Sequence, residues 1–115
     1  MDQQPIPQVT ADDVIRIVRR DFPPEEQAEV LRELEGLGAA AKPRVQLAVL
    51  KLIQGKLDAL PRHIAMAKQD WRDVLMYAEY PADARISWGR PPEDHHGAYQ
   101  ADWEQYQDWL RRENR

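Results

Sequence analysis

Residues 43–54 of this 115-residue chain read PRVQLAVLKLIQ, and this stretch decides the fold. Apolar side chains occupy most of it, and only a narrow polar strip remains, through Gln46, Lys51 and Gln54. A helix that is apolar nearly all round is normally enclosed by other helices. A buried strand is the alternative for a short apolar run, but the sequence offers no second strand to pair with it. We therefore expect residues 43–54 to form the central helix of the core.

Prolines, glycines and capping residues predict four more short helices around the central one. Thr10 offers an N-cap for the first helix, and Pro23 ends it because proline disfavours helical angles at the preceding residue. Pro24 can begin the second helix, and Asp58 and Asp70 are predicted caps of the fourth and fifth. Spacing predicts that the inward-facing side chains of these four helices are Val14, Ile17, Val18, Ala28, Leu31, Leu34, Leu60, Ile64, Ala67, Trp71, Val74, Leu75 and Ala78.

The last third of the chain differs in composition, since eight of the nine aromatic residues lie between Trp71 and Trp109. Residues 81–97 contain prolines and glycines without periodicity and predict a long loop. Periodicity returns near residue 98 and predicts a C-terminal helix over residues 98–113. Its apolar stripe has to be buried either on its own bundle or on another subunit; it comprises Tyr99, Trp103, Tyr106 and Leu110.

These elements predict an all-α fold, a compact orthogonal bundle of five short helices plus a C-terminal aromatic-rich helix. The length allows one domain, which we place at residues 10–115. Residues 1–9 contain two prolines and no periodicity, so we expect a flexible lead-in there.

Two segments resemble parts of small uncharacterised bacterial all-helical proteins. They are RVQLAVLKL at residues 44–52 and RDVLMYAEYP at residues 72–81. The resemblance spans residues 10–81 and rests on helix-packing patterns. It implies a bacterial, single-domain, helical protein and carries no activity, cofactor or catalytic residue with it.

Composition excludes several classes of protein. The chain has no cysteine, which excludes a disulfide scaffold, a thiolate nucleophile and a cysteine-ligated metal. No apolar run is long enough to span a membrane, and the first residues lack the basic start of a secretion signal, so we expect a cytoplasmic protein without a membrane partner.

The net charge of -4 hides an alternation along the chain. Residues 38–72 carry seven basic and two acidic side chains, whereas residues 21–37 and 79–108 are each predominantly acidic. This flanking negative charge argues against nucleic acid as a partner. The arginines of the first helix are predicted to lie mostly opposite its apolar face and to be solvated; they are Arg16, Arg19 and Arg20.

Candidates for chemistry are few. Adjacent His95 and His96 follow two carboxylates and could hold a divalent ion, although zinc ligands are usually separated by spacers and an exposed polar turn explains them equally. Ser87 is the single serine and lacks the G-x-S-x-G context of a nucleophile elbow. Glu79 could act as a general acid if a pocket desolvated it. We predict no cofactor, no metal site and no catalytic residue, and keep a small metal-dependent or hydrolytic enzyme as the alternative function.

Aromatic and arginine side chains gather just before and within the last helix. Trp, Tyr and Arg dominate the hot spots of protein interfaces, although Tyr80 and Trp88 could instead fold back over the core. The chain is therefore interpreted as a small acidic protein-interaction or regulatory module, for which a toxin-neutralising immunity protein is one fitting role. It would bind another protein, or associate with itself through the C-terminal helix, using Tyr80, Arg85, Trp88, Arg90, Trp103 and Tyr106.

Overall fold

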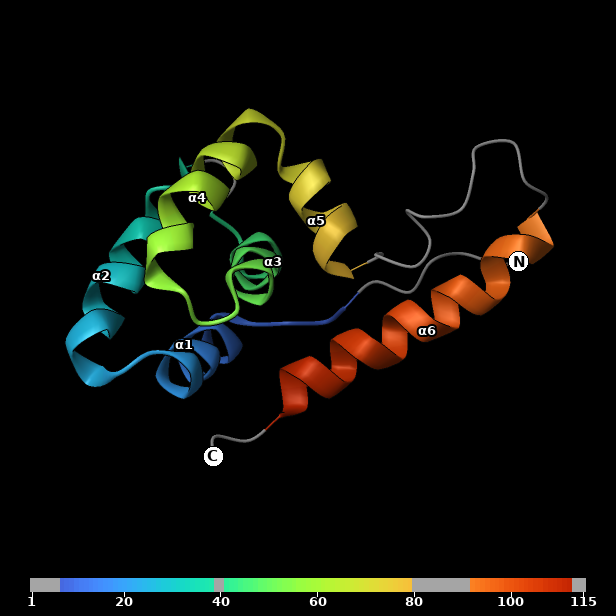
Figure 1. The fold of residues 1–115 in the computed structure, drawn as a ribbon, viewed down its shortest axis with the longest axis horizontal. Coiled ribbons are helices and arrows are strands. Elements are labelled where there is room, and N and C mark those ends of the chain that lie inside the picture. The colour runs from blue at the N-terminus through green and yellow to red at the C-terminus, as the bar shows by residue number, and fades with distance from the viewer. Residues whose placement is uncertain (1–6, 39–40, 80–91, 113–115) are drawn as a thin grey trace.

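The chain folds as an all-α bundle, shown by a computed structural model that describes residues 7–38, 41–79 and 92–112, with the side chains of residues 92–99 left out (Figure 1). The all-α prediction is confirmed. In chain order the helices are α1 (Ala11–Asp21), α2 (Pro24–Glu35), α3 (Pro43–Ile53), the 3-10 turn η2 (Leu57–Ala59), α4 (Leu60–Gln69), α5 (Trp71–Glu79) and α6 (Pro92–Arg111).

The central helix lies where the apolar pattern places it. Figure 1 shows α3 nearly end-on, with α1 below it, α2 and α4 on one side and α5 on the other. Four consecutive side chains, Leu47, Ala48, Val49 and Leu50, have no exposed surface. Burying a leucine or valine side chain stabilises a fold by about 1.5–3 kcal/mol, so α3 contributes the largest single share of the core.

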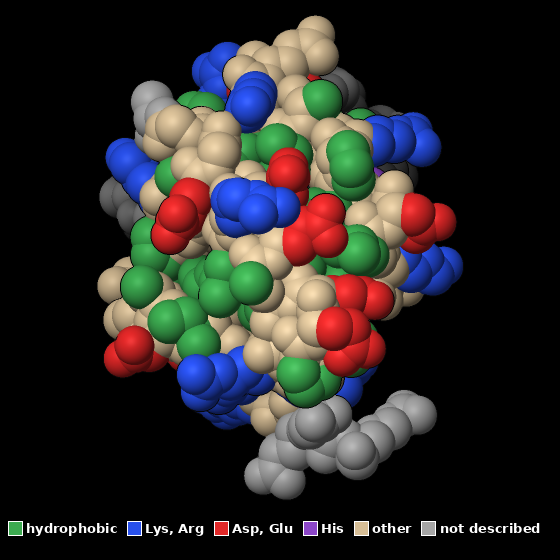
Figure 2. Space-filling view, turned by 90° about the vertical axis from the view of Figure 1, so that its left-hand side faces the viewer, with side chains coloured by type: hydrophobic (Ala, Val, Ile, Leu, Met, Phe, Trp, Pro, Cys, Tyr) green, Lys and Arg blue, Asp and Glu red, His purple; other side chains and the backbone are tan. Residues whose placement is uncertain are grey.

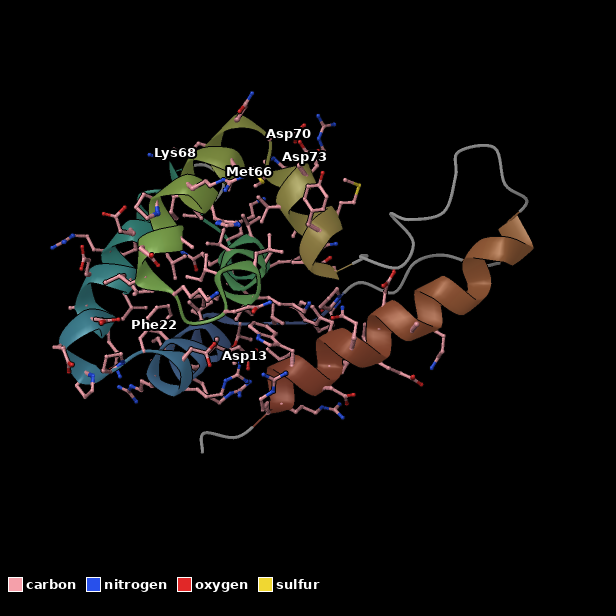
Figure 3. All side chains as sticks on the ribbon, in the orientation of Figure 1. Asp13, Phe22, Met66, Lys68, Asp70 and Asp73 are labelled. Carbon is pink, nitrogen blue, oxygen red and sulfur yellow. The ribbon has the colours of Figure 1, made fainter. Side chains whose placement is uncertain are left out.

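Proline sets the boundary between α1 and α2. Phe22 ends α1 in an extended conformation, with φ -127° and ψ 143°, and its ring is buried. Figure 3 shows Phe22 at the turn between the two helices. Pro24 is the first residue of α2, where its missing N–H costs no hydrogen bond. At the other end of α1, the Thr10 N–H donates to the Asp13 carboxylate over 2.9 Å, which is half of a capping box.

The connection after α3 brings the chain back against α1. Gln54 and Gly55 both adopt left-handed angles, with φ of 51° and 75°. A Cβ added to Gly55 would lie 3.1 Å from the Asp21 carbonyl oxygen, so only glycine allows this close approach. The turn therefore packs directly on the end of α1.

The C-terminal helix begins earlier than its periodicity indicates. It spans Pro92–Arg111, whereas the sequence predicts residues 98–113. The difference has a simple cause, because Pro92 followed by two acidic residues is a helix-start signal, and Gly97 is tolerated inside the helix rather than ending a loop. At 20 residues, α6 is about 30 Å long, and it extends past the bundle to give overall dimensions of 47 × 32 × 22 Å (Figure 1).

The lead-in joins the fold before residue 10. Pro7 is buried, and Val9 packs against the core although it is only partly covered. Val9 therefore contributes a contact to the core from the segment that precedes α1. Residues 1–6 lie outside the described part of the chain.

Candidate functional site

Helix α5 presents two large aromatic side chains to solvent. Its inner face is buried as predicted, through Val74, Leu75 and Ala78. Trp71 is 45% exposed, and Tyr77 is 52% exposed. The prediction that Trp71 faces inward is therefore wrong. Its position on the helix is suited to burial, but it is the first residue of α5 and directly follows the Asp70 joint between α4 and α5.

The start of α5 is fixed by a local network. Asp70 alone separates α4 from α5, and its carboxylate accepts hydrogen bonds from the Arg72 N–H and from Arg72 Nε, each over 3.0 Å. These bonds from Arg72 lower the pKa of Asp70. Figure 3 shows Asp70 and Asp73 at this joint. The predicted cap is therefore present at the start of α5.

The end of α5 is fixed by a buried ion pair. Arg44, near the start of α3, donates from Nη2 to Glu79 Oε1 over 2.7 Å and from Nε to Glu79 Oε2 over 2.9 Å. The Glu79 side chain is 1% exposed. Because the guanidinium engages both carboxylate oxygens, Glu79 links the end of α5 to the start of α3. The pair therefore holds the last residue of α5 against α3.

The last part of α6 packs on the bundle of its own chain. Tyr106 is 1% exposed, and Trp109 and Leu110 are 7% exposed, so all three belong to the main core. The Tyr106 ring packs at a tilt against that of Trp109, with centroids 5.6 Å apart. Of the predicted stripe, Tyr106 and Leu110 are thus buried on their own bundle, and Tyr106 is not accessible to a partner in this structure.

Trp103 lies half-buried at one edge of α6. Two positions further along, the Gln105 amide donates to the Ala78 carbonyl oxygen of α5 over 3.4 Å. Because residues two apart in a helix point to nearly opposite sides, Trp103 leaves α6 on the side away from α5.

Several predicted site residues lie outside the described part of the chain. Residues 80–91 contain four of the six predicted partner-binding residues and also Ser87; the four are Tyr80, Arg85, Trp88 and Arg90. His95 and His96 belong to the first part of α6, but their side chains are not described. The remaining histidine, His63, is half-buried on α4, with Nδ1 2.9 Å from the Ala59 carbonyl oxygen.

The described residues, 7–38, 41–79 and 92–112 without the side chains of 92–99, offer no group of three His, Cys, Asp or Glu that could hold a metal ion. Among the same residues, none of the helices has the length and apolar character needed to cross a membrane.

The face formed by α2 and α4 is mixed in charge. Figure 2 views the molecule from this side and shows Lys and Arg side chains alternating with Asp and Glu, with small apolar areas between them. Neither sign of charge dominates this face. It therefore lacks the continuous positive surface with which proteins bind the phosphate backbone of nucleic acids.

Three charged residues, all buried or half-buried, have structural roles that the sequence does not predict. Arg20 is directed at the end of α6, Glu79 pairs with Arg44, and Asp102 is buried under α6 at 1% exposure. A signal was present for two of them. Glu79 follows Leu75 by four residues and Asp102 precedes Tyr106 by four, so both lie on the apolar stripe of their helix.

Comparison with known proteins gives no relative. No protein family matches this chain, and neither the curated proteins nor the solved structures include a match. The resemblance to small bacterial helical proteins thus stays a prediction.

Proposed function

We propose that this chain is a small acidic protein-interaction or regulatory module that acts in the cytoplasm, with an immunity-type role as one form of it. The proposed contact surface, called here the α5 surface, consists of Trp71 and Tyr77 and continues into residues 80–91. The observation that carries the proposal is the exposure of both aromatic side chains on a nine-residue helix. Tyr and Trp provide large contact areas at low entropic cost, which is why they dominate interface hot spots.

The positions of the charged groups support binding rather than chemistry. Glu79 and Arg44 bind each other, and the Arg20 guanidinium binds Asp21 and the end of α6. These groups are engaged in holding helices together. In addition, residues 80–91, which contain the predicted arginines and aromatics, follow α5 directly in the sequence.

Site-specific photo-crosslinking in the native host tests the proposal. A photoreactive phenylalanine analogue replaces Tyr77 in one full-length variant and Trp71 in another. We expect covalent adducts with one and the same partner protein from both positions, because a binding surface brings the partner within a few ångströms of each. The measurement is the mass of the adducts on a denaturing gel and their identity by mass spectrometry.

The matched control places the same analogue at Arg62, an exposed residue of α4. This position should give no adduct with that partner. Adducts of equal yield from position 62, or none from positions 71 and 77 at native abundance, would contradict the α5 surface as the contact site.

A further inference from the structure

The described side chains of α6 attach it to the bundle between positions 102 and 110. Among these side chains, residues 100–111, four are buried, namely Asp102, Tyr106, Trp109 and Leu110. By contrast, six of the eleven residues of α3 are buried, and all six are apolar. Figure 1 shows the first turns of α6 extending past the bundle. The described part of α6 is therefore less deeply buried than α3.

One arginine, Arg20, links the end of α1 to the end of α6. Arg20, near the end of α1, donates from Nη1 to the Trp109 carbonyl oxygen over 2.6 Å and to the Arg112 carbonyl oxygen over 2.9 Å. Its Cζ lies 5.2 Å from the centre of the Trp109 ring, and its Nε donates to Asp21 over 2.8 Å. The last carbonyls of a helix have no partners within the helix and carry partial negative charge. The Arg20 guanidinium thus caps the C-terminal end of α6 and also lies over the ring of Trp109, a buried side chain of that helix.

Charge burial makes this attachment weaker than an apolar one. Asp102 is buried beneath α6, and Lys51 of α3 is half-buried within electrostatic range of both Asp102 and Arg112. Removing charges from water costs several kcal/mol per ion, and pairing recovers this only in part. Docking of α6 includes the cost of burying Asp102, as the α3–α5 contact includes the cost of burying Glu79.

Arginines hold both α5 and α6 in place. Arg44 holds Glu79 at the end of α5 through a bidentate contact, and Arg20 holds the end of α6. We propose that α6 is a releasable latch, whose residues 102–110 detach from the bundle while α1–α5 stay folded, and that Arg20 is the positioning residue that keeps it attached. If the proposed function holds, release would break the contact of Gln105 with α5 and so regulate the α5 surface.

The absence of cysteine in the chain permits a direct test. Two full-length variants carry one thiol each, Leu110→Cys on α6 and Ala48→Cys on α3, and the rate of thiol labelling is measured in native buffer and in low urea. A local opening exposes little surface, so its rate depends weakly on urea. We expect labelling at position 110 to be at least about tenfold faster than at position 48, and to depend less on urea.

Substitution of Arg20 provides a second test of the latch. Arg20→Met keeps an apolar stem and removes the charged donors, and it should accelerate labelling at position 110 by about tenfold or more while that labelling keeps its weak dependence on urea. Arg19→Met, an exposed neighbour on α1, should change neither rate. Equal rates and equal urea dependence at the two positions would overturn the latch, because α6 would then open only with the whole domain.

Hydrogen exchange on the unmodified chain gives an independent measurement if a cysteine variant does not fold. Amides of residues 100–112 should exchange faster than those of residues 43–53, and exchange of both segments in one cooperative step would overturn the proposal. Neither measurement involves a partner, so failure of the latch is distinguishable from failure of the proposed function.

Discussion

At the scale of single residues, the inward-facing charges decide how the helices are joined. Arg20 and Arg44 both lie on helices that the apolar pattern predicts, and both guanidinium groups bind another helix. Their partners are far away in the chain, 89 residues from Arg20 to Trp109 and 35 residues from Arg44 to Glu79. Periodicity can place a charge on or near a buried face, but it cannot name a partner at such a separation.

Removal of one member of the α3–α5 ion pair should be costly. Arg44→Met leaves the Glu79 carboxylate buried without its guanidinium, and we expect the free energy of unfolding to fall by about 3 kcal/mol. Urea denaturation followed by circular dichroism measures this loss. The double variant Arg44→Met/Glu79→Leu should recover most of it, because apolar groups of similar size can replace a buried pair at little cost.

The exposed residue Arg62 provides the control for that experiment. Arg62→Met should change the free energy of unfolding by no more than about 0.5 kcal/mol. If Arg44→Met falls within the same range, then the carboxylate is not held in a water-excluded position, and the anchor at the end of α5 is wrong.

At the scale of helices, sequence reasoning succeeds where local chemistry sets the boundary. Pro23 and Pro24 separate α1 from α2, and the apolar run of α3 identifies the central helix. Sequence reasoning fails where two signals compete. Gly97 suggests a loop and Pro92 suggests a helix start, and the structure follows Pro92. It fails again at Trp71, because periodicity describes a helix of unlimited length and does not indicate where the neighbouring helices end.

The contact between α3 and α6 should respond to pH through Lys51. Burial lowers the pKa of Lys51 below its usual 10.5, and the Asp102 charge offsets this only partly. Between the lowered pKa and 10.5, the unfolded chain binds a proton that the folded chain does not bind, so the contribution of Lys51 to stability rises with pH. The free energy of unfolding of the unmodified chain should therefore increase relative to that of Lys51→Met as the pH is raised from 7 to about 10.5.

Urea denaturation at several pH values measures this difference, and the titration of other groups cancels because both proteins contain them. Lys68→Met, which removes an exposed lysine of α4, should give a difference that does not vary with pH. A constant difference for Lys51→Met as well would show that Lys51 is fully solvated in the folded chain.

At the scale of the whole molecule, the segregation of charge along the sequence is not preserved as separate charged faces on the side that Figure 2 shows. The acidic helix α2 lies beside the more basic α4, and the two signs alternate over their common face. Sequence arithmetic predicts this neighbourhood, because oppositely charged segments of one domain favour packing beside each other. The charge count does not predict which charged side chains leave the surface. Packing between helices buries or half-buries four of them, namely Arg20, Lys51, Glu79 and Asp102.

A metal titration separates the interaction module from the enzyme that remains its alternative. We expect zinc or manganese to leave the melting temperature unchanged, since the proposed surface works through aromatic and arginine contacts. An ion bound only by the folded chain would add about 2.7 kcal/mol at 100 times its dissociation constant, which corresponds to a rise of about 10 °C for a domain of this size. Differential scanning fluorimetry detects such a rise. If one occurs and His95→Gln/His96→Gln abolishes it, the two histidines hold the ion, and metal-dependent chemistry takes precedence over partner binding as the explanation of this chain.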